Sequence, residues 1–184
     1  MQKICVCIVG KSCTGKSTLA KYCKEKYELK MLESYTTRPK REKELEGHTF
    51  ITDKEFDELN NIVAYGEFGG YRYCATKEQI DNSDLYVVDL QGIKELKEKY
   101  IDNENKRRIY VVYIHTSFVK RLIRSIKDNG LINGIKRIQR DKGMFTDINK
   151  TLSNLSWICL SHNNTCDTRE ISKFIQDIVE DNIN

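Results

Sequence analysis

Residues 10–17, Gly-Lys-Ser-Cys-Thr-Gly-Lys-Ser, have the types and spacing of a phosphate-binding loop. The pattern G-x-x-x-x-G-K-[ST] needs glycine where the backbone approaches a phosphate closely, and Gly10 and Gly15 occupy those positions. Lys16 is expected to reach the β- and γ-phosphates of ATP, and the Ser17 hydroxyl to coordinate Mg²⁺. The predicted ATP-binding residues are Gly10, Lys11, Ser12, Cys13, Thr14, Gly15, Lys16 and Ser17. The alternative is a glycine-rich turn that binds nothing.

The elements around this loop alternate between apolar strand patterns and helical patterns. Strands are predicted at 3–9, 29–32, 84–88, 108–115 and 157–160, and helices at 17–26, 92–100, 118–126 and 169–179. A strand therefore precedes the loop and a helix follows it, as phosphate binding at a helix N-terminus requires. Such alternation predicts an α/β fold in which helices cover both faces of a parallel sheet.

The middle of the chain breaks this alternation. Strand patterns at 62–68 and 71–76 are joined by Gly69-Gly70, which predicts a hairpin within a small antiparallel insert on the sheet. The polar, glycine-bearing stretch 127–134 is either a mobile lid or an ordinary surface loop. One domain is expected over 1–184, with its core at 1–33 and 77–184, an insert at 34–76 and a lid at about 125–136.

Composition limits the function classes. The net charge is +4, which is too small a surplus to suggest a nucleic-acid binder. The apolar run at 4–9 is too short to cross a membrane and leads into the loop, so neither a membrane anchor nor a signal peptide is expected. The seven cysteines contain no CxxC pair, so we predict a reduced cytoplasmic protein. A monomer or a homodimer is expected. Cys13, inside the loop, is either a reactive thiol or a small filler residue.

The segment 34–41, Ser-Tyr-Thr-Thr-Arg-Pro-Lys-Arg, together with the upstream phosphate loop, resembles the guanylate kinase family. The resemblance continues through Glu44 and Gly47, residues 68–73 (Phe-Gly-Gly-Tyr-Arg-Tyr) and residues 89–92 (Asp-Leu-Gln-Gly). It implies a P-loop NTPase fold with an acceptor-binding insert and a lid. It also implies transfer of the γ-phosphate of ATP, with Mg²⁺, to a small phosphorylated acceptor, with GMP or dGMP as first choice.

The resemblance assigns acceptor-binding roles to five positions. Arg38 and Arg41 are expected to hold the acceptor phosphate, where bidentate guanidinium groups suit a phosphate better than lysine does. Tyr73 is expected to touch the same phosphate and Ser34 to bond the guanine. Asp89 either contacts the acceptor nucleoside, or holds Mg²⁺ through water, or caps the following helix.

Lid arginines of the family stabilise charge on the transferring phosphoryl group. Arg137 is the first candidate for that role here, and Arg124 and Arg140 are weaker candidates, because the lid spacing differs. Lys16, Arg38 and Arg137 are thus the predicted catalytic residues.

The residues that read the base depart from the family pattern. Ala64 stands where the guanine-reading glutamate is expected, and Glu67 has the opposite strand parity. Ala75 and Val87 stand where the family has a hydroxyl residue and an aspartate. His48 lies near the position of a family tyrosine that is displaced here, and it is either an acceptor contact or a plain loop residue. One alternative is therefore a kinase of another nucleotide or of a sugar phosphate. The other is a non-catalytic binding module, and the intact phosphate loop argues against it.

Overall fold

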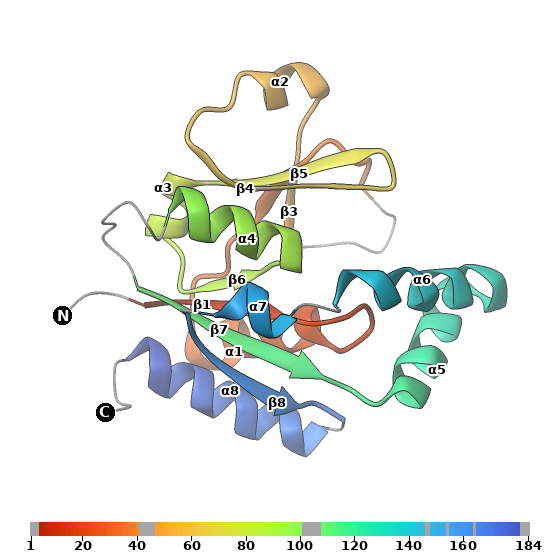
Figure 1. The fold of residues 1–184 in the computed structure, drawn as a ribbon. Coiled ribbons are helices and arrows are strands. Elements are labelled where there is room, and N and C mark those ends of the chain that lie inside the picture. Colours follow the sequence, from red (N-terminus) through yellow and green to blue (C-terminus); the bar gives the residue numbers. More distant parts are fainter. Residues whose placement is uncertain are drawn as a thin grey trace.

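The computed structural model describes residues 4–40, 47–100, 108–145, 148–153, 155–163 and 165–180. Its centre is a four-stranded parallel sheet in the order β6-β1-β7-β8 (Figure 1). The strands are β1 (Ile4–Val9), β6 (Leu85–Val87), β7 (Arg108–His115) and β8 (Ser156–Ser161). Every residue of β1 is buried, as expected for an apolar run in the middle of a parallel sheet.

Helices cover both faces of this sheet, as predicted. On one face, α1 (Lys16–Tyr27) and α8 (Thr165–Val179) pack against alternate residues of β1, such as Val6 and Ile8. On the other face, Cys5 and Cys7 share a core with α4 (Leu90–Lys99) and α7 (Ile148–Leu152). The period-2 alternation of a strand thus assigns β1 to two separate cores.

The predicted insert is a second four-stranded sheet in the order β3-β2-β5-β4. Its strands are β2 (Ser34–Thr36), β3 (His48–Phe50), β4 (Ile62–Phe68) and β5 (Tyr71–Thr76), with the short helices α2 (Asp53–Asp57) and α3 (Lys77–Asp81). The β4–β5 hairpin is confirmed with its predicted bounds. The sheet is mixed instead of wholly antiparallel, because β2 and β3 run parallel. Helix α4 packs against β4 and joins the two sheets into one core.

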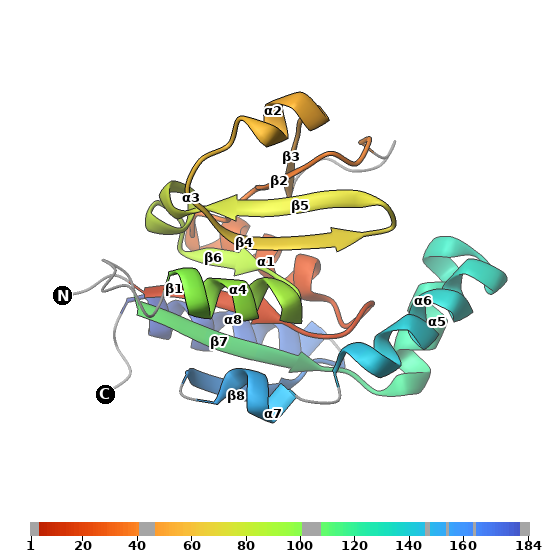
Figure 2. The same cartoon turned by 45° about the horizontal axis from the view of Figure 1, so that its top comes forward.

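Two helices replace the irregular stretch expected at 127–134. Helix α5 (Phe118–Asn129) and helix α6 (Leu131–Met144) meet at Gly130, whose φ of +75° turns the chain. A Cβ on Gly134 would lie 2.8 Å from backbone atoms of Ile126, so the two helices pack closely there. This α5–α6 hairpin projects from the body of the molecule (Figure 2). The prediction of irregular structure is therefore wrong, because the glycines serve a turn and a helix crossing.

The remaining differences concern short elements and element ends. The strands β2 and β3 and the helices α2, α3 and α7 are not among the predicted elements. The strand expected at 29–32 is a single parallel bridge between Met31 and Leu85, and α8 begins four residues earlier than predicted, at Thr165 in place of Arg169. Across the described ranges, no helix has the length and apolar character needed to span a bilayer.

Candidate functional site

The carboxyl ends of the parallel strands converge on one edge of the sheet, where open α/β sheets bind ligands. The loop at 10–17 follows β1, Asp89 follows β6, Thr116 follows β7 and His162 follows β8. The Thr116 hydroxyl contacts the carbonyl oxygens of Thr14 at 3.1 Å and His162 at 2.6 Å. The predicted phosphate loop is therefore fixed from beneath by the ends of two neighbouring strands.

Two residues of the loop have left-handed backbone conformations. Cys13 and Gly15 have positive φ angles of 61° and 93°. A Cβ at Gly15 would lie 2.4 Å from the His162 ring, and one at Gly10 would lie 2.5 Å from the Ile114 carbonyl oxygen. Close approach of other groups therefore requires both glycines, and at Gly15 the positive φ requires glycine as well.

Lys16 folds back over the loop. Its Nζ donates to the carbonyl oxygens of Gly10 at 2.7 Å and Lys11 at 3.1 Å. The pKa of Lys16 is lowered to about 8, mainly by burial and also by nearby Arg137, while the Asp141 carboxylate opposes both. The ammonium group is therefore short of counter-charge, a condition that favours an incoming anion.

Two adjoining cavities flank Lys16. The first, of about 830 Å³, runs over the loop towards β8 and α5. The second, of about 320 Å³, opens towards the insert. The two cavities share four lining residues, which are Ser12, Lys16, Ser17 and Arg137. The predicted donor and acceptor regions thus meet along a common wall.

The second cavity brings the insert's candidate residues to the loop. Arg38, Tyr73 and Asp89 line it together with Lys16 and Ser17. Arg41 is outside the described residues.

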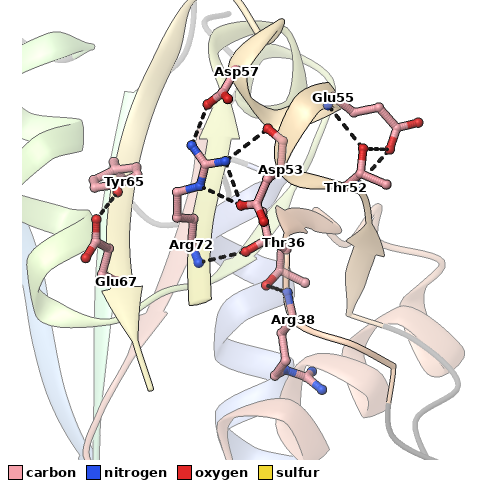
Figure 3. Close-up of polar contacts among 10 residues, drawn as sticks. Thr36, Arg38, Thr52, Asp53, Glu55, Asp57, Tyr65, Glu67 and Arg72 are labelled. Atoms are coloured by element: carbon pink, nitrogen blue, oxygen red, sulfur yellow. Dashed lines mark hydrogen bonds and ion pairs between the residues drawn. The ribbon is translucent and has the colours of Figure 1, made fainter. Parts of the chain in front are cut away.

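Arg38 is only 7% exposed, because local contacts hold it inward. Its backbone N–H donates to Thr36 Oγ1 at 3.2 Å, its Nη1 donates to the Pro39 carbonyl at 2.8 Å, and its guanidinium carbon lies 5.4 Å from the centre of the Phe50 ring. Figure 3 shows its side chain directed away from the contacts that join β5 to α2.

Those contacts are made by Arg72, whose role the sequence did not reveal. Its guanidinium pairs with Asp53 at 2.7 Å and Asp57 at 2.6 Å, and its backbone N–H donates to Thr37 Oγ1 at 3.1 Å. Arg72 thereby ties β5 both to α2 and to the segment that carries Arg38 (Figure 3).

A third, smaller cavity of about 130 Å³ lies between the insert and the start of α4, beside Ala64, Asp89 and Tyr73. Ser34 Oγ and His48 Nδ1 are 2.9 Å apart at its wall, and the His48 and Tyr73 rings pack edge to face at 5.6 Å. His48 is therefore part of this cavity and not a plain loop residue.

Two carboxylates near this cavity differ in their placement. Asp89 caps α4 by accepting from the Gly92 N–H at 2.7 Å, and it also lines both insert cavities. Glu67 is exposed and accepts a hydrogen bond from the Tyr65 hydroxyl (Figure 3), in keeping with the orientation predicted from its parity.

The three candidate lid arginines also differ in their placement and contacts. Arg137 lines the two large cavities, and its Nε is buried with no hydrogen-bond partner among the described residues. Arg124 donates to the carbonyl oxygen of Cys13 at 3.3 Å. The side chain of Arg140 is outside what the structure describes.

No group of three His, Cys, Asp or Glu residues able to hold a metal is found in the described part of the chain. A Mg²⁺ ion bound together with a nucleotide uses only one or two protein oxygens beside phosphates and water. Ser17 and Asp89 supply oxygens to the same cavity.

Comparison with known proteins gives one consistent result. The family model described as guanylate kinase matches residues 2–167. Guanylate kinases from Clostridium acetobutylicum and Bartonella henselae are each 33% identical, over 106 residues (52% of this chain, 51% of that protein) and over 96 residues (46% and 43%). The aligned part of the chain thus spans about half the length of these curated relatives. The crystal structure of guanylate kinase from Anaplasma phagocytophilum has a TM-score of 0.59 at 18% identity, covering 99% of this chain and 87% of that one, and this shows likeness of fold.

Proposed function

The chain belongs to the guanylate kinase family, and we propose from this that it transfers the γ-phosphate of ATP to a nucleoside monophosphate, with GMP or dGMP as first choice. The products are ADP and a nucleoside diphosphate. The observation that carries the proposal is the common wall of the two large cavities, where Lys16 and Arg137 face both. Transfer between two polyanions needs fixed cations at the place where the phosphates meet.

The donor half of the proposal rests on the loop. Backbone N–H groups of residues 10–17 and the N-terminus of α1 direct positive potential at one place. Lys16 lies half-buried beside that place, and the bound phosphates would take the Lys16 ammonium from the carbonyl oxygens of Gly10 and Lys11. A Mg²⁺ ion held through the Ser17 hydroxyl and the phosphates would supply charge neutralisation at the β- and γ-oxygens.

The acceptor half rests on Arg38 and Tyr73. Both line the cavity that adjoins Lys16, and the guanidinium of Arg38 can pair with a phosphate through two hydrogen bonds. Arg41 is proposed for the same phosphate from the family resemblance alone. The acceptor's phosphate oxygen is already anionic, so it can attack the γ-phosphorus without a general base. Arg137 would then stabilise the charge that develops on the transferring group.

The nucleoside of the acceptor would enter the small cavity beside Ser34, His48 and Ala64. Ala64 carries no group that can accept hydrogen bonds from guanine N–H groups, so selectivity for guanine rests on Ser34, Asp89 and His48. This favours, as a second candidate, a kinase that accepts other phosphorylated compounds.

An assay of ADP release over all nucleoside and deoxynucleoside monophosphates and a set of sugar phosphates tests the proposal. Activity with GMP or dGMP well above the others supports the first candidate, and a different preferred acceptor supports the second. Lys16→Ala should nearly abolish turnover, whereas Lys21→Ala, which removes an exposed α1 lysine paired with Glu25, should leave it unchanged. No binding of ATP and Mg²⁺ in calorimetry would instead favour a non-catalytic module.

A further inference from the structure

Ser12, in the middle of the phosphate loop, is held through three of its atoms. The Asp141 carboxylate accepts from the Ser12 N–H at 2.8 Å and from its hydroxyl at 3.0 Å. The Arg121 Nε donates to the Ser12 carbonyl oxygen at 2.9 Å. Arg121 and Asp141 also form an ion pair, and each is 5% exposed. Each buried charge therefore has a partner, which a stable buried ion pair requires.

These two residues come from different helices of the α5–α6 hairpin, Arg121 from α5 and Asp141 from α6. The helices are joined to each other by their close crossing at Gly134 and by a hydrogen bond of 3.0 Å from the Ser125 hydroxyl to the Gly134 carbonyl. The hairpin is thus attached to the loop chiefly at Ser12, with a further bond of 3.3 Å from Arg124 of α5 to the carbonyl oxygen of Cys13.

Arg137 lies one helical turn before Asp141 and so shares its face of α6. It lines both large cavities, and its buried Nε has no partner among the described groups. A buried donor without an acceptor is costly, so this arrangement suits a site whose acceptor is a bound anion. Where that donor lies depends on where Asp141 anchors the helix.

We propose that Asp141 is a positioning residue for phosphoryl transfer: its contact with Ser12 fixes α6 over the phosphate loop and so sets Arg137 between the donor and acceptor cavities. This inference rests on the proposed function. Asp141 also borders the acceptor cavity, so the test must separate a direct contact with the acceptor from an effect through Arg137. The effect of Asp141 is expected on the chemical step, because a displacement of Arg137 by about 1 Å can cost about a hundredfold in rate.

The test is a double-mutant cycle with Asp141→Asn, Arg137→Ala and the variant that combines them. Asp141→Asn keeps the size of the side chain but weakens its bonds to Ser12 and Arg121. The expected result is a fall in kcat of about ten- to a hundredfold with the Kd for ATP changed by less than about threefold. In the Arg137→Ala background the same change should have little further effect, because the group that Asp141 positions is already gone.

Ser12→Ala supplies a second measurement if Asp141→Asn does not fold. It removes only the hydroxyl bond to Asp141, so a smaller loss of kcat is expected, again suppressed by Arg137→Ala. Glu170→Gln, which neutralises an exposed acid on α8, is the matched control and should behave as the unmodified protein.

Multiplicative losses in the double variant would overturn the proposal, since Asp141 would then act independently of Arg137. A weaker affinity for ATP with kcat unchanged would also overturn it, since Asp141 would then determine the shape of the loop. A stronger affinity with kcat unchanged would do the same, since Asp141 would then compete with the phosphate. The proposed function is tested separately by the unmodified protein: absence of turnover with every acceptor overturns that function, whatever the variants do.

Discussion

The ring of His162 lies against the phosphate loop, with its Nδ1 2.7 Å from the carbonyl oxygen of Thr14. Because a carbonyl can only accept, Nδ1 carries the hydrogen, and Nε2 accepts from the Thr168 hydroxyl at 2.8 Å. A histidine after the last strand thereby supports the backbone at the centre of the predicted ATP site.

His162→Ala should weaken ATP binding by about tenfold. The Thr14 carbonyl loses the hydrogen bond from Nδ1, and the loop loses the ring that packs against Gly15. His162→Asn should recover part of the loss, since its amide can replace the Nδ1–H donor. Calorimetric titration with ATP and Mg²⁺ measures both variants. Equal affinities for the unmodified and alanine forms would contradict the supporting role.

Gly15→Ala should abolish measurable ATP binding. The residue has a φ of 93°, and an added Cβ would lie 2.4 Å from the His162 ring. Gly70→Ala is the matched control, because Gly70 also has a positive φ, 79°, but nothing lies within 4 Å of its added Cβ. Both changes should cost about 1 kcal/mol of stability from the backbone conformation, whereas only the first should affect nucleotide binding. Thermal melting and titration of the two variants separate these effects.

ATP affinity should fall as the pH rises through about 8, the value to which burial lowers the pKa of Lys16. Below that pH, Lys16 is already charged and pairs with the phosphates at once. Above it, the free protein has lost the proton and must take one up on binding, because the phosphates raise the lysine pKa. Calorimetry in two buffers of different ionisation enthalpy should detect this uptake near pH 8.5. Lys16→Met should show none, and uptake of the same size in that variant would assign the proton to another group.

Ala64→Glu should increase the preference for GMP over AMP. Ala64 borders the small cavity, so a carboxylate there can face that space and accept guanine N–H groups. A polar group that pairs with one base and not the other can change selectivity by about tenfold or more. The measurement is the ratio of kcat/KM for the two acceptors, with Ala64→Gln as the control that adds size without charge. An unchanged ratio would argue that the base of the acceptor binds elsewhere.

Arg38→Lys should lower acceptor use more than ATP binding. Lysine keeps the positive charge but cannot form the paired hydrogen bonds of a guanidinium, and it loses the packing of Arg38 on Phe50. The expected result is a KM for the acceptor raised by about tenfold or more, with the Kd for ATP nearly unchanged. A larger effect on ATP than on the acceptor would place Arg38 on the donor side.

The phosphate loop and the strands around it could be predicted from the sequence because their signals are local. The glycines of the loop, the apolar run of β7 and the Gly-Gly turn of the β4–β5 hairpin each lie within a few consecutive residues, and the structure has β7 and that hairpin at their predicted bounds. Local signals failed for the α5–α6 hairpin. Gly134 looks like a loop residue in the sequence, but it is needed inside α6 because α5 crosses there.

The contacts that complete the candidate site could not be predicted, because they join residues far apart in the chain. Asp141 bonds to Ser12 across 129 positions, and His162 contacts Thr14 across 148. Neither residue has a neighbouring pattern that marks it. The sequence indicates His48 only as one of two alternatives, because its contact with Ser34 depends on the parallel pairing of β2 and β3, which no periodicity predicts.

The common wall of the two large cavities has a practical meaning for inhibition. A single molecule that joins two nucleosides through a chain of phosphates could occupy both cavities at once, passing Lys16 and Arg137 on the way. Once one end is bound, the other is held near its own cavity at an effective concentration of about millimolar or higher, without any new contact. The length of phosphate chain that binds most tightly would then serve as a ruler for the distance between donor and acceptor.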